Sequence, residues 1–262
     1  MTAMPFDLEW VRAQLPNRRI EWHSSIDSTM TAAAHLAREG AASGTVVGAD
    51  EQTAGIGRHG HSWHSEPGAG LYVSFVLRPL IGADALPLVM LALGLATRDA
   101  IVQVTGERTA PLAPDLRWPN DVLLNGKKCA GILAQKEDDA IVAGIGINIE
   151  HRHFPPEIEP LATSLLLAGA TVSRETVLVA LANHVATYCD VLSEQGAEPI
   201  RIMFSQASSY ASGRRVRVDP GGAPGSAVIE GVTRGLDPFG FLVVRQDNGK
   251  DVTILAGGVR PA

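Results

Sequence analysis

The segment WPNDVLLNGKKCAGI, residues 118–132, contains an Asn-Gly pair between two runs of apolar residues that favour strands. Asn-Gly is a strong signal for a two-residue type I′ turn, because both central positions of that turn need a positive φ. The segment therefore predicts a β-hairpin. In this hairpin Asp121 lies on one arm, and Lys127 and Lys128 lie on the facing arm.

The lysine pair has two interpretations that the residues alone leave open. Lysines beside an Asn-Gly turn are most often solvated, and we assign Lys127 to that role. Lys128 is followed by the small-residue run Ala130, Gly131 and Ile132, which is typical of the wall of a pocket. A Lys128 that points inward would bring a compact positive charge to a bound anion.

Strands and helices flank the hairpin on both sides. Ser28 stands where a helix N-cap is expected, and Gly40 and Gly196 stand where helices are expected to stop. A short amphipathic turn is expected at residues 6–15. We expect strands at 18–26, 45–52, 71–80 and 140–149, and helices at 29–40, 86–104 and 173–194, with a shorter helix that ends near residue 210.

The chain changes character after residue 211. From Gly213 onward, β-rich runs alternate with the turn-rich segments DPGGAPG, DPFG and DNGK. This pattern is typical of a small all-β barrel of about 50 residues. We therefore place a domain boundary here and divide the chain into residues 1–211 and 212–262.

The segment AGIGRHGHSW, residues 54–63, is rich in glycine between two predicted strands. Glycine lets the backbone approach a ligand closely, and Arg58 supplies a fixed charge suited to phosphate or carboxylate. No helix follows, because Pro67 and further glycines precede the next strand, so the segment is neither a dinucleotide fingerprint nor a phosphate-binding P-loop. A flexible hairpin loop without a ligand is the alternative interpretation.

Composition excludes several classes of protein. The 262 residues, 45% of them hydrophobic, are enough for one large domain with or without a small one. The net charge of −6 argues against a nucleic-acid partner, and the basic run at 213–217 alternates with apolar residues. The two cysteines, Cys129 and Cys189, support neither a disulfide framework nor a zinc site, and we assign no metal ligands.

The sequence shows no signal for export and no predicted membrane-spanning segment. The longest apolar stretch, Leu86–Ala96, is about half of the roughly 20 residues that a membrane span needs. We therefore expect no membrane partner and a cytoplasmic location.

Four motifs in a fixed order resemble those of the biotin protein ligases, also called biotin–acetyl-CoA-carboxylase ligases. They are SSIDSTM, EQTAGIGRHGHSW, RWPNDVLLNGKKCAGI and GIGIN, and the resemblance runs from about residue 18 to the C-terminus. It implies an α+β protein. Residues 1–211 would form a mixed-sheet catalytic domain of the biotin/lipoate ligase type, and residues 212–262 a small SH3-like β barrel.

The resemblance also implies an activity. Such an enzyme forms biotinyl-5′-AMP from biotin and ATP, with Mg²⁺ as activator. It then transfers biotin to one lysine of a biotin carboxyl carrier protein, a domain of acetyl-CoA carboxylase or a related carboxylase. The rival hypotheses are a lipoate or octanoyl ligase and a biotin-binding transcriptional regulator.

The start of the chain bears on the regulator hypothesis. About 17 residues precede the region of resemblance, too few for a DNA-binding domain of roughly 60 residues. We therefore expect the monofunctional class, without a DNA-binding domain, and a homodimer is left open.

The resemblance assigns roles to individual residues. Ser28, Thr29 and Gln52 match positions that bind the ureido ring of biotin, and Trp63 would line its valeryl chain. The full set of expected biotin-binding residues is Ser28, Thr29, Gln52, Gly55, Ile56, Gly57, Arg58, Trp63, Lys128 and Gly131. The expected nucleotide-binding residues are Arg58, His61, Lys128 and Asn148.

Two of these residues carry the expected chemistry. Arg58 and Lys128 are assigned as catalytic because they would neutralise charge on the reacting phosphate. Asp121 is assigned a supporting role. The alternative for Ser28 is that of a simple N-cap, and the alternative for Trp63 is that of a core residue.

The chain departs from the family pattern at several positions. Met30 replaces the usual Asn, Ile56 replaces an Arg, and His61 stands where a basic residue is common. Arg260 lies about two positions before the place of the family's C-terminal arginine. We expect these departures to tune ligand affinity and to leave the reaction class unchanged.

Overall fold

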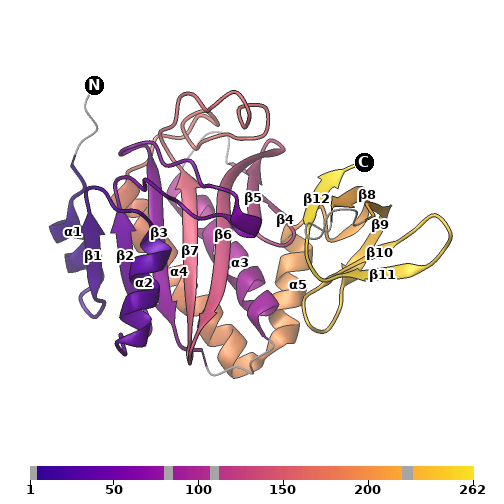
Figure 1. Ribbon diagram of the computed structural model, residues 1–262, viewed down its shortest axis with the longest axis horizontal. Helices are drawn as coiled ribbons and strands as arrows, with labels where there is room; N and C mark the ends of the chain where they lie inside the picture. The colour runs from indigo at the N-terminus through magenta and orange to yellow at the C-terminus, as the bar shows by residue number, and fades with distance from the viewer. Residues whose placement is uncertain (1–4, 80–84, 107–111, 220–226) are drawn as a thin grey trace.

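The computed structural model describes residues 5–79, 85–106, 112–219 and 227–262, and it contains two sheets (Figure 1). The larger sheet has seven strands in the order β1-β2-β3-β7-β6-β5-β4. Only β1 and β2 pair in parallel, and the other neighbours are antiparallel. The strands are β1 (Ile20–His23), β2 (Thr45–Ala49), β3 (Gly70–Leu77), β4 (Asp115–Arg117), β5 (Asp121–Leu124), β6 (Lys127–Glu137) and β7 (Ala140–Asn148). The predicted α+β class with a mixed sheet is confirmed.

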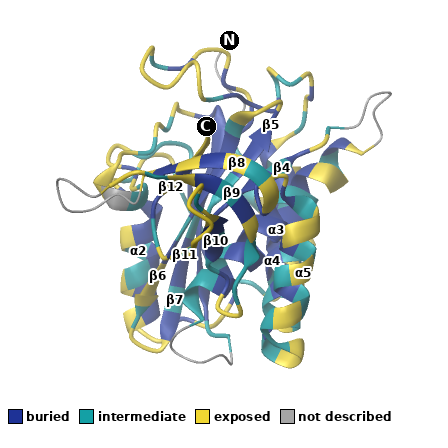
Figure 2. Ribbon diagram, turned by 90° about the vertical axis from the view of Figure 1, so that its right-hand side faces the viewer, coloured by how far each residue is buried: buried dark blue, intermediate teal, exposed yellow. Residues whose placement is uncertain are grey.

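Helices cover both faces of the larger sheet (Figure 1). Helix α2 (Thr29–Arg38) packs on one face, where its buried side chains meet Val47, Val76 and Val142. Helices α3 (Leu86–Thr105) and α4 (Arg174–Gln195) cover the other face and pack against each other. Figure 2 shows the buried sheet between helices whose outer sides are exposed. The two faces thus build two separate apolar cores.

The predicted hairpin is present. Asn125 and Gly126 have φ values of 52° and 79°, the positive values that a type I′ turn requires. They join β5 to β6, and Asp121 lies opposite Gly131 in the register of these strands. The hairpin signal therefore fixed both the turn and the strands.

Helix ends follow the capping rules in part. The Ser173 side chain accepts a hydrogen bond from the Thr176 N–H, which caps α4 as expected for serine. Ser28 occupies the N-cap position of α2, but its side chain makes no capping hydrogen bond. Helix α4 ends at Gln195, directly before Gly196, as expected, and the shorter helix α5 (Ala197–Ala207) follows.

The smaller sheet has five antiparallel strands in the order β11-β10-β9-β8-β12. They are β8 (Ser212–Asp219), β9 (Ile229–Leu236), β10 (Leu242–Arg245), β11 (Asp251–Ile254) and β12 (Gly258–Pro261). The expected run DVTILAGGV is divided into β11 and β12. Most of the expected DPGGAPG turn lies outside the described residues.

The two sheets share one apolar core. Val216, Leu242 and Ile254 of the smaller sheet belong to the same cluster as the buried side of α3. The Trp118 indole N–H also donates a buried hydrogen bond of 3.0 Å to the Gly240 carbonyl. Because the core is continuous, the boundary after residue 211 stays a prediction, although the second sheet begins at Ser212.

Two expectations about helices need correction. Residues 6–15 form a true helix, α1 (Leu8–Gln14), because the Asp7 side chain accepts from the Trp10 N–H and caps it. Helices α3 and α4 are also long and apolar enough, by length and composition alone, to cross a membrane. Both helices pack against the rest of the protein. The most apolar 18-residue stretch of α3 is 67% buried, as in the core helix of a folded domain.

Candidate active site

A cavity of about 430 Å³, which includes its open mouth, lies where the glycine-rich loop meets the hairpin. Its floor comes from β6 and β7 and is mainly apolar. Thr29 and Gln52 supply neutral polar groups at one end of the cavity. Arg58 and Lys128 supply positive charges at the other end, and Asn120 supplies an amide there. The lining residues are Thr29, Met30, Gln52, Ile56, Gly57, Arg58, Trp63, Val73, Asn120, Lys128, Gly131, Ile132, Leu133, Gly144, Ile145 and Gly146.

The neutral end of the cavity is a chain of uncharged hydrogen bonds. The Gln52 carbonyl oxygen accepts from the Thr29 N–H at 2.9 Å and from the Thr29 hydroxyl at 3.0 Å. The Thr29 hydroxyl also lies 2.8 Å from the Ser74 hydroxyl, and the Gln52 amide donates to Ser65 at 3.3 Å. Next to this chain, the buried Ser28 hydroxyl has no hydrogen-bond partner. A buried unpaired hydroxyl is costly, so a ligand that pairs with it gains affinity.

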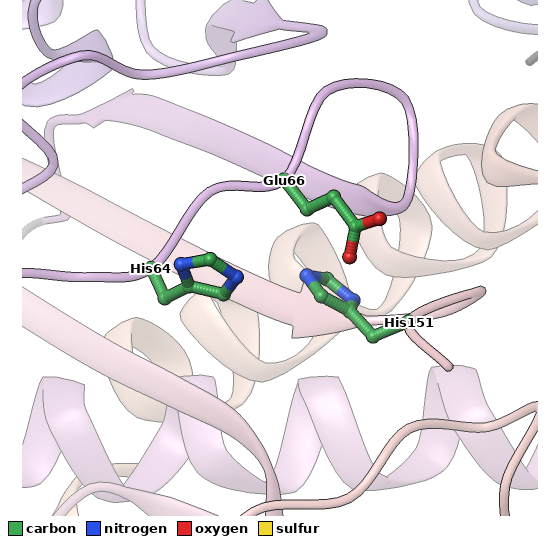
Figure 3. A group of neighbouring side chains, drawn as sticks. All are labelled: His64, Glu66 and His151. Atoms are coloured by element: carbon green, nitrogen blue, oxygen red, sulfur yellow. The ribbon is translucent and has the colours of Figure 1, made fainter. Parts of the chain in front are cut away.

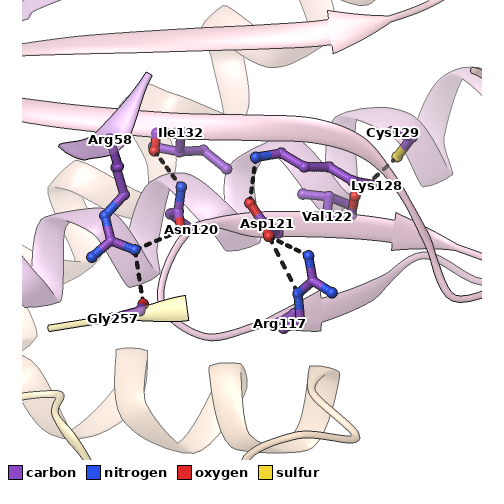
Figure 4. Close-up of polar contacts among 9 residues, drawn as sticks. All are labelled: Arg58, Arg117, Asn120, Asp121, Val122, Lys128, Cys129, Ile132 and Gly257. Atoms are coloured by element: carbon purple, nitrogen blue, oxygen red, sulfur yellow. Dashed lines mark hydrogen bonds and ion pairs between the residues drawn. The ribbon is translucent and has the colours of Figure 1, made fainter. Parts of the chain in front are cut away.

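The cationic end of the cavity centres on Asp121 (Figure 4). Lys128 Nζ lies 2.6 Å from Asp121 Oδ1, and Arg117 donates to Asp121 Oδ2 at 2.6 and 3.2 Å. Burial alone would raise the pKa of Asp121, but Lys128 and Arg117 outweigh burial and lower it. The carboxylate is therefore ionised at neutral pH, and Arg117 can compensate it when Lys128 turns toward a ligand.

Arg58 completes the cationic end from the glycine-rich loop. Its guanidinium donates to the Asn120 side-chain oxygen at 3.0 Å and to the Gly257 carbonyl at 3.3 Å. Asn120 in turn donates to the Ile132 carbonyl at 3.1 Å. Burial lowers the pKa of Arg58, against the attraction of Asp121, but an arginine keeps its charge at neutral pH. Arg58 thus joins the loop, the hairpin and the C-terminal sheet.

The glycine-rich loop closes mainly on itself. The Gly57 N–H donates to the His61 carbonyl at 2.7 Å, and the Trp63 N–H donates to the Gly55 carbonyl at 2.9 Å. A Cβ at Gly55 would lie 2.8 Å from the Trp63 carbonyl oxygen, and one at Gly57 would lie 2.9 Å from the His61 carbonyl oxygen. These glycines are needed for the tight fold of the loop, so their presence alone does not indicate a ligand.

Trp63 rests on two glycines of the cavity floor. A Cβ at Gly146 would lie 2.4 Å from the indole ring, and one at Gly131 would lie 2.7 Å from it. Lys128 Nζ lies 5.3 Å from the centre of the same ring. The small residues of β6 and β7 therefore make room for the aromatic wall of the cavity.

The departure at Met30 is accommodated in the same way. A Cβ at Gly144 would lie 2.6 Å from the Met30 sulfur, so this glycine makes room for the longer side chain. Met30 is 5% exposed and lines the cavity beside Thr29. An unbranched thioether adapts well to such a gap.

The cavity brings together eight of the residues expected in the site. They are Thr29, Gln52, Ile56, Gly57, Arg58, Trp63, Lys128 and Gly131. The other expected residues, Ser28, Gly55, His61, Asp121 and Asn148, are not among those that line it. Asn148 is buried and donates to the Thr163 carbonyl at 2.9 Å, and the His61 side chain is exposed.

The sequence did not single out several residues of the cationic end. Asn120 and Arg117 lie within the motif RWPND. Their closeness to Asp121 in the sequence could have identified them as residues of the site. Gly257 lies far along the chain, and no local pattern connects it with Arg58. Cys129, next to Lys128, is fully buried, and burial raises the pKa of its thiol to about 12, so it is no nucleophile here.

Two family models match the chain. The model of the biotin/lipoate A/B protein ligase family matches residues 22–151, and that of the biotin protein ligase C terminal domain matches residues 211–259. The chain is 34% identical to bifunctional ligase/repressor BirA of Bacillus subtilis, over 91% of this chain and 73% of that protein. It is also 34% identical to the biotin–acetyl-CoA-carboxylase ligase of Paracoccus denitrificans, over 86% of this chain and 94% of the relative.

The chain therefore belongs to the biotin protein ligase family, and the resemblance seen in the sequence is confirmed. Solved structures agree. The biotin protein ligase from Aquifex aeolicus in complex with biotin and ATP has a TM-score of 0.79 and 29% identity, and the match covers 93% of this chain and 99% of that one. The Leishmania major ligase in complex with biotinyl-5-AMP has a TM-score of 0.63 and 26% identity, over 91% and 99% of the two chains.

Proposed function

We propose that this enzyme is an ATP-dependent biotin ligase that forms biotinyl-5′-AMP and then transfers biotin to a lysine of a carrier domain of a carboxylase. One observation carries the proposal: a single cavity joins a neutral hydrogen-bonding end to a cationic end across an apolar floor. Biotin has the matching order of groups, a neutral ureido ring, an apolar chain and a carboxylate.

The neutral end suits the ureido ring. This ring offers two N–H donors and a carbonyl acceptor, and none of them is charged. The Thr29 hydroxyl and the Gln52 amide line this end of the cavity and supply complementary donors and acceptors. The apolar floor and Trp63 then accommodate the valeryl chain, which directs the carboxylate toward Lys128 and Arg58.

The cationic end suits the first chemical step. A carboxylate oxygen of biotin attacks the α-phosphorus of ATP, the bond to the bridging oxygen breaks, and pyrophosphate leaves. Two anions must approach each other, so fixed positive charge at Arg58 and Lys128 stabilises the transition state. Their contacts with Asn120 and Asp121 hold both cations in place before ATP arrives.

The second step needs an amine and an environment that excludes water. The ε-amine of the carrier lysine attacks the biotinyl carbonyl, an amide forms, and AMP leaves with the electrons of the anhydride bond. A loop that stays closed over the mixed anhydride protects it from hydrolysis. Arg58 ties the glycine-rich loop to the Gly257 carbonyl, which favours a closed position.

Magnesium fits this site as a companion of ATP. Among the described residues, none with a carboxylate lines the cavity. Mg²⁺ in such sites is held largely by substrate phosphates and water, with few protein ligands. We therefore expect the ion to arrive on the polyphosphate, where it neutralises part of its charge.

The test is ATP-dependent transfer of radiolabelled biotin to a purified biotin carrier domain, with radiolabelled lipoate in a parallel reaction. We expect stable labelling of the carrier with biotin and none without ATP. Labelling with lipoate and not with biotin would overturn the proposal in favour of a lipoate ligase. The absence of nucleic-acid and membrane partners and the cytoplasmic location stay predictions.

A further inference from the structure

Three side chains that bind metals well meet near the start of β3 and the end of β7 (Figure 3). His64 and Glu66 lie between the glycine-rich loop and β3, and His151 lies just after β7. Each offers one ligand atom, and these atoms lie within 4.8 Å of one another. The start of β3 pairs with the end of β7, Gly70 with Asn148, so sheet topology brings together residues far apart in the chain.

The imidazole of His151 is oriented so that one ring nitrogen can bind a metal ion. Its side chain is fully buried, its Nδ1 has no hydrogen-bond partner, and its Nε2 lies 3.2 Å from the Tyr72 hydroxyl. Tyr72 donates its single proton to the Glu66 carbonyl at 2.9 Å, so its oxygen is left to accept from His151. Nε2 must then carry the ring proton and donate to Tyr72, which leaves the Nδ1 lone pair free.

A hydrogen-bonded N–H on the far side of the ring is the usual arrangement in metal-binding histidines, because it fixes the tautomer and the orientation of the ring. Phe154 stacks on the His151 ring with the centroids 5.1 Å apart, which holds it further.

The other two ligands are exposed and free to adjust. His64 and Glu66 both face solvent, so an ion can enter from outside. In a tetrahedral site with bonds of about 2.0 to 2.1 Å, neighbouring ligand atoms are roughly 3.3 Å apart. Small rotations of two exposed side chains are enough to reach this spacing.

We propose that His64, Glu66 and His151 form a binding site for a divalent transition-metal ion, with Zn²⁺ as the best match. Two imidazoles and one carboxylate are typical zinc ligands, whereas Ca²⁺ and Mg²⁺ prefer oxygen alone. None of the three residues lines the cavity, so the site is separate from the proposed active site. Because His64 directly follows Trp63, the ion ties the end of the glycine-rich loop to the end of β7.

The test uses the full chain after treatment with EDTA, titrated with ZnCl₂ in a calorimeter. We expect one Zn²⁺ per chain. Loss of a hydrogen-bond partner of a metal ligand weakens binding by about 10- to 100-fold, so loss of a ligand in His64→Ala or Glu66→Gln should cost at least that much. Both residues are exposed, so the variants should fold, and their melting temperatures without metal check this.

The matched control is His153→Ala, which removes an exposed histidine two positions from His151. It should bind Zn²⁺ as the wild type does. In hydrogen exchange, Zn²⁺ should slow the amides of residues 54–63 in the wild type and in this control but not in His64→Ala. No stoichiometric binding to the wild type, or equal affinity in His64→Ala and His153→Ala, would overturn the proposal. Neither measurement depends on ligase activity.

Discussion

The two ends of the cavity are built in different ways. At the neutral end, Thr29, Gln52 and Ser74 are joined by uncharged hydrogen bonds that are complete without a ligand. At the cationic end, Lys128 is paired with a largely buried carboxylate, and Arg58 is held by two carbonyl oxygens. The neutral end is suited to recognise the substrate, and the cationic end supplies positive charge that can be redirected to a bound anion.

This difference predicts different kinetic roles. A group that stabilises the ground state and the transition state equally affects binding alone. We expect this of the neutral end, because it faces a part of biotin that does not react. Groups that face the charge developing on the phosphate stabilise the transition state more than the ground state, so they affect the rate. Variants at the cationic end should lower kcat, and variants at the neutral end should raise the Kd of biotin.

The largest effect is expected for Lys128→Ala. Removal of this charge should lower the rate of adenylation by on the order of 10²-fold or more. The fold should survive because Arg117 still pairs with Asp121. Pyrophosphate release and thermal unfolding are measured on the same samples. Lys127→Ala, which removes the exposed neighbour, is the control and should keep the wild-type rate; a folded Lys128→Ala with a normal rate would remove Lys128 from the mechanism.

Arg58→Ala should come next. One charge-assisted hydrogen bond contributes about 1.5 to 3 kcal/mol, so the variant should release biotinyl-5′-AMP roughly 10- to 100-fold faster. Biotin itself should lose less affinity than the adenylate, because the lost guanidinium addresses mainly the phosphate. Release of the intermediate is followed in single-turnover reactions without a carrier.

The control for Arg58 is Arg217→Ala, which removes an exposed arginine of β8. It should retain the adenylate as the wild type does. If Arg58→Ala also retains it, the contacts with Asn120 and Gly257 are purely structural, and the cationic end reduces to Lys128.

The sequence predicted the parts of this site that depend on local patterns. The Asn-Gly turn fixed the hairpin, and the hairpin placed Lys128 opposite the strand of Asp121. The exposed Lys127 and the cavity-lining Lys128 also agree with the orientation expected from the small residues that follow them. Short-range geometry was enough in each case.

The remaining parts depend on contacts that no local pattern records. The Arg58–Gly257 hydrogen bond joins the glycine-rich loop to the segment between β11 and β12. The group of His64, Glu66 and His151 forms because β3 and β7 are neighbours in the sheet. The glycines show a different problem. Gly55 and Gly57 looked like ligand contacts, yet close packing within the loop already requires them.

A smaller effect is expected for Thr29→Val at the neutral end. The loss of one uncharged hydrogen bond costs about 0.5 to 1.5 kcal/mol, which corresponds to a Kd for biotin that is raised roughly two- to tenfold. At saturating biotin the adenylation rate should be unchanged. Thr31→Val, an exposed position of the same helix, is the control and should leave the Kd unaltered. A fall in kcat at saturation would show that the two ends do not differ in kinetic role.

The smallest effect is expected for Ile56→Arg, which restores the family pattern at the rim of the cavity. Ile56 lines the cavity but is 40% exposed, so a charge placed there is screened by water. Exposed ion pairs contribute about 0.2 to 1 kcal/mol, so biotin should bind at most about fivefold more tightly. Calorimetry measures the affinity, and Ile202→Arg, at an exposed position of α5, controls for added charge. Because the gain acts on the biotin carboxylate, it should disappear with biotin methyl ester. An equal gain with the ester would show that the new side chain acts through the loop and adds nothing to the cationic end.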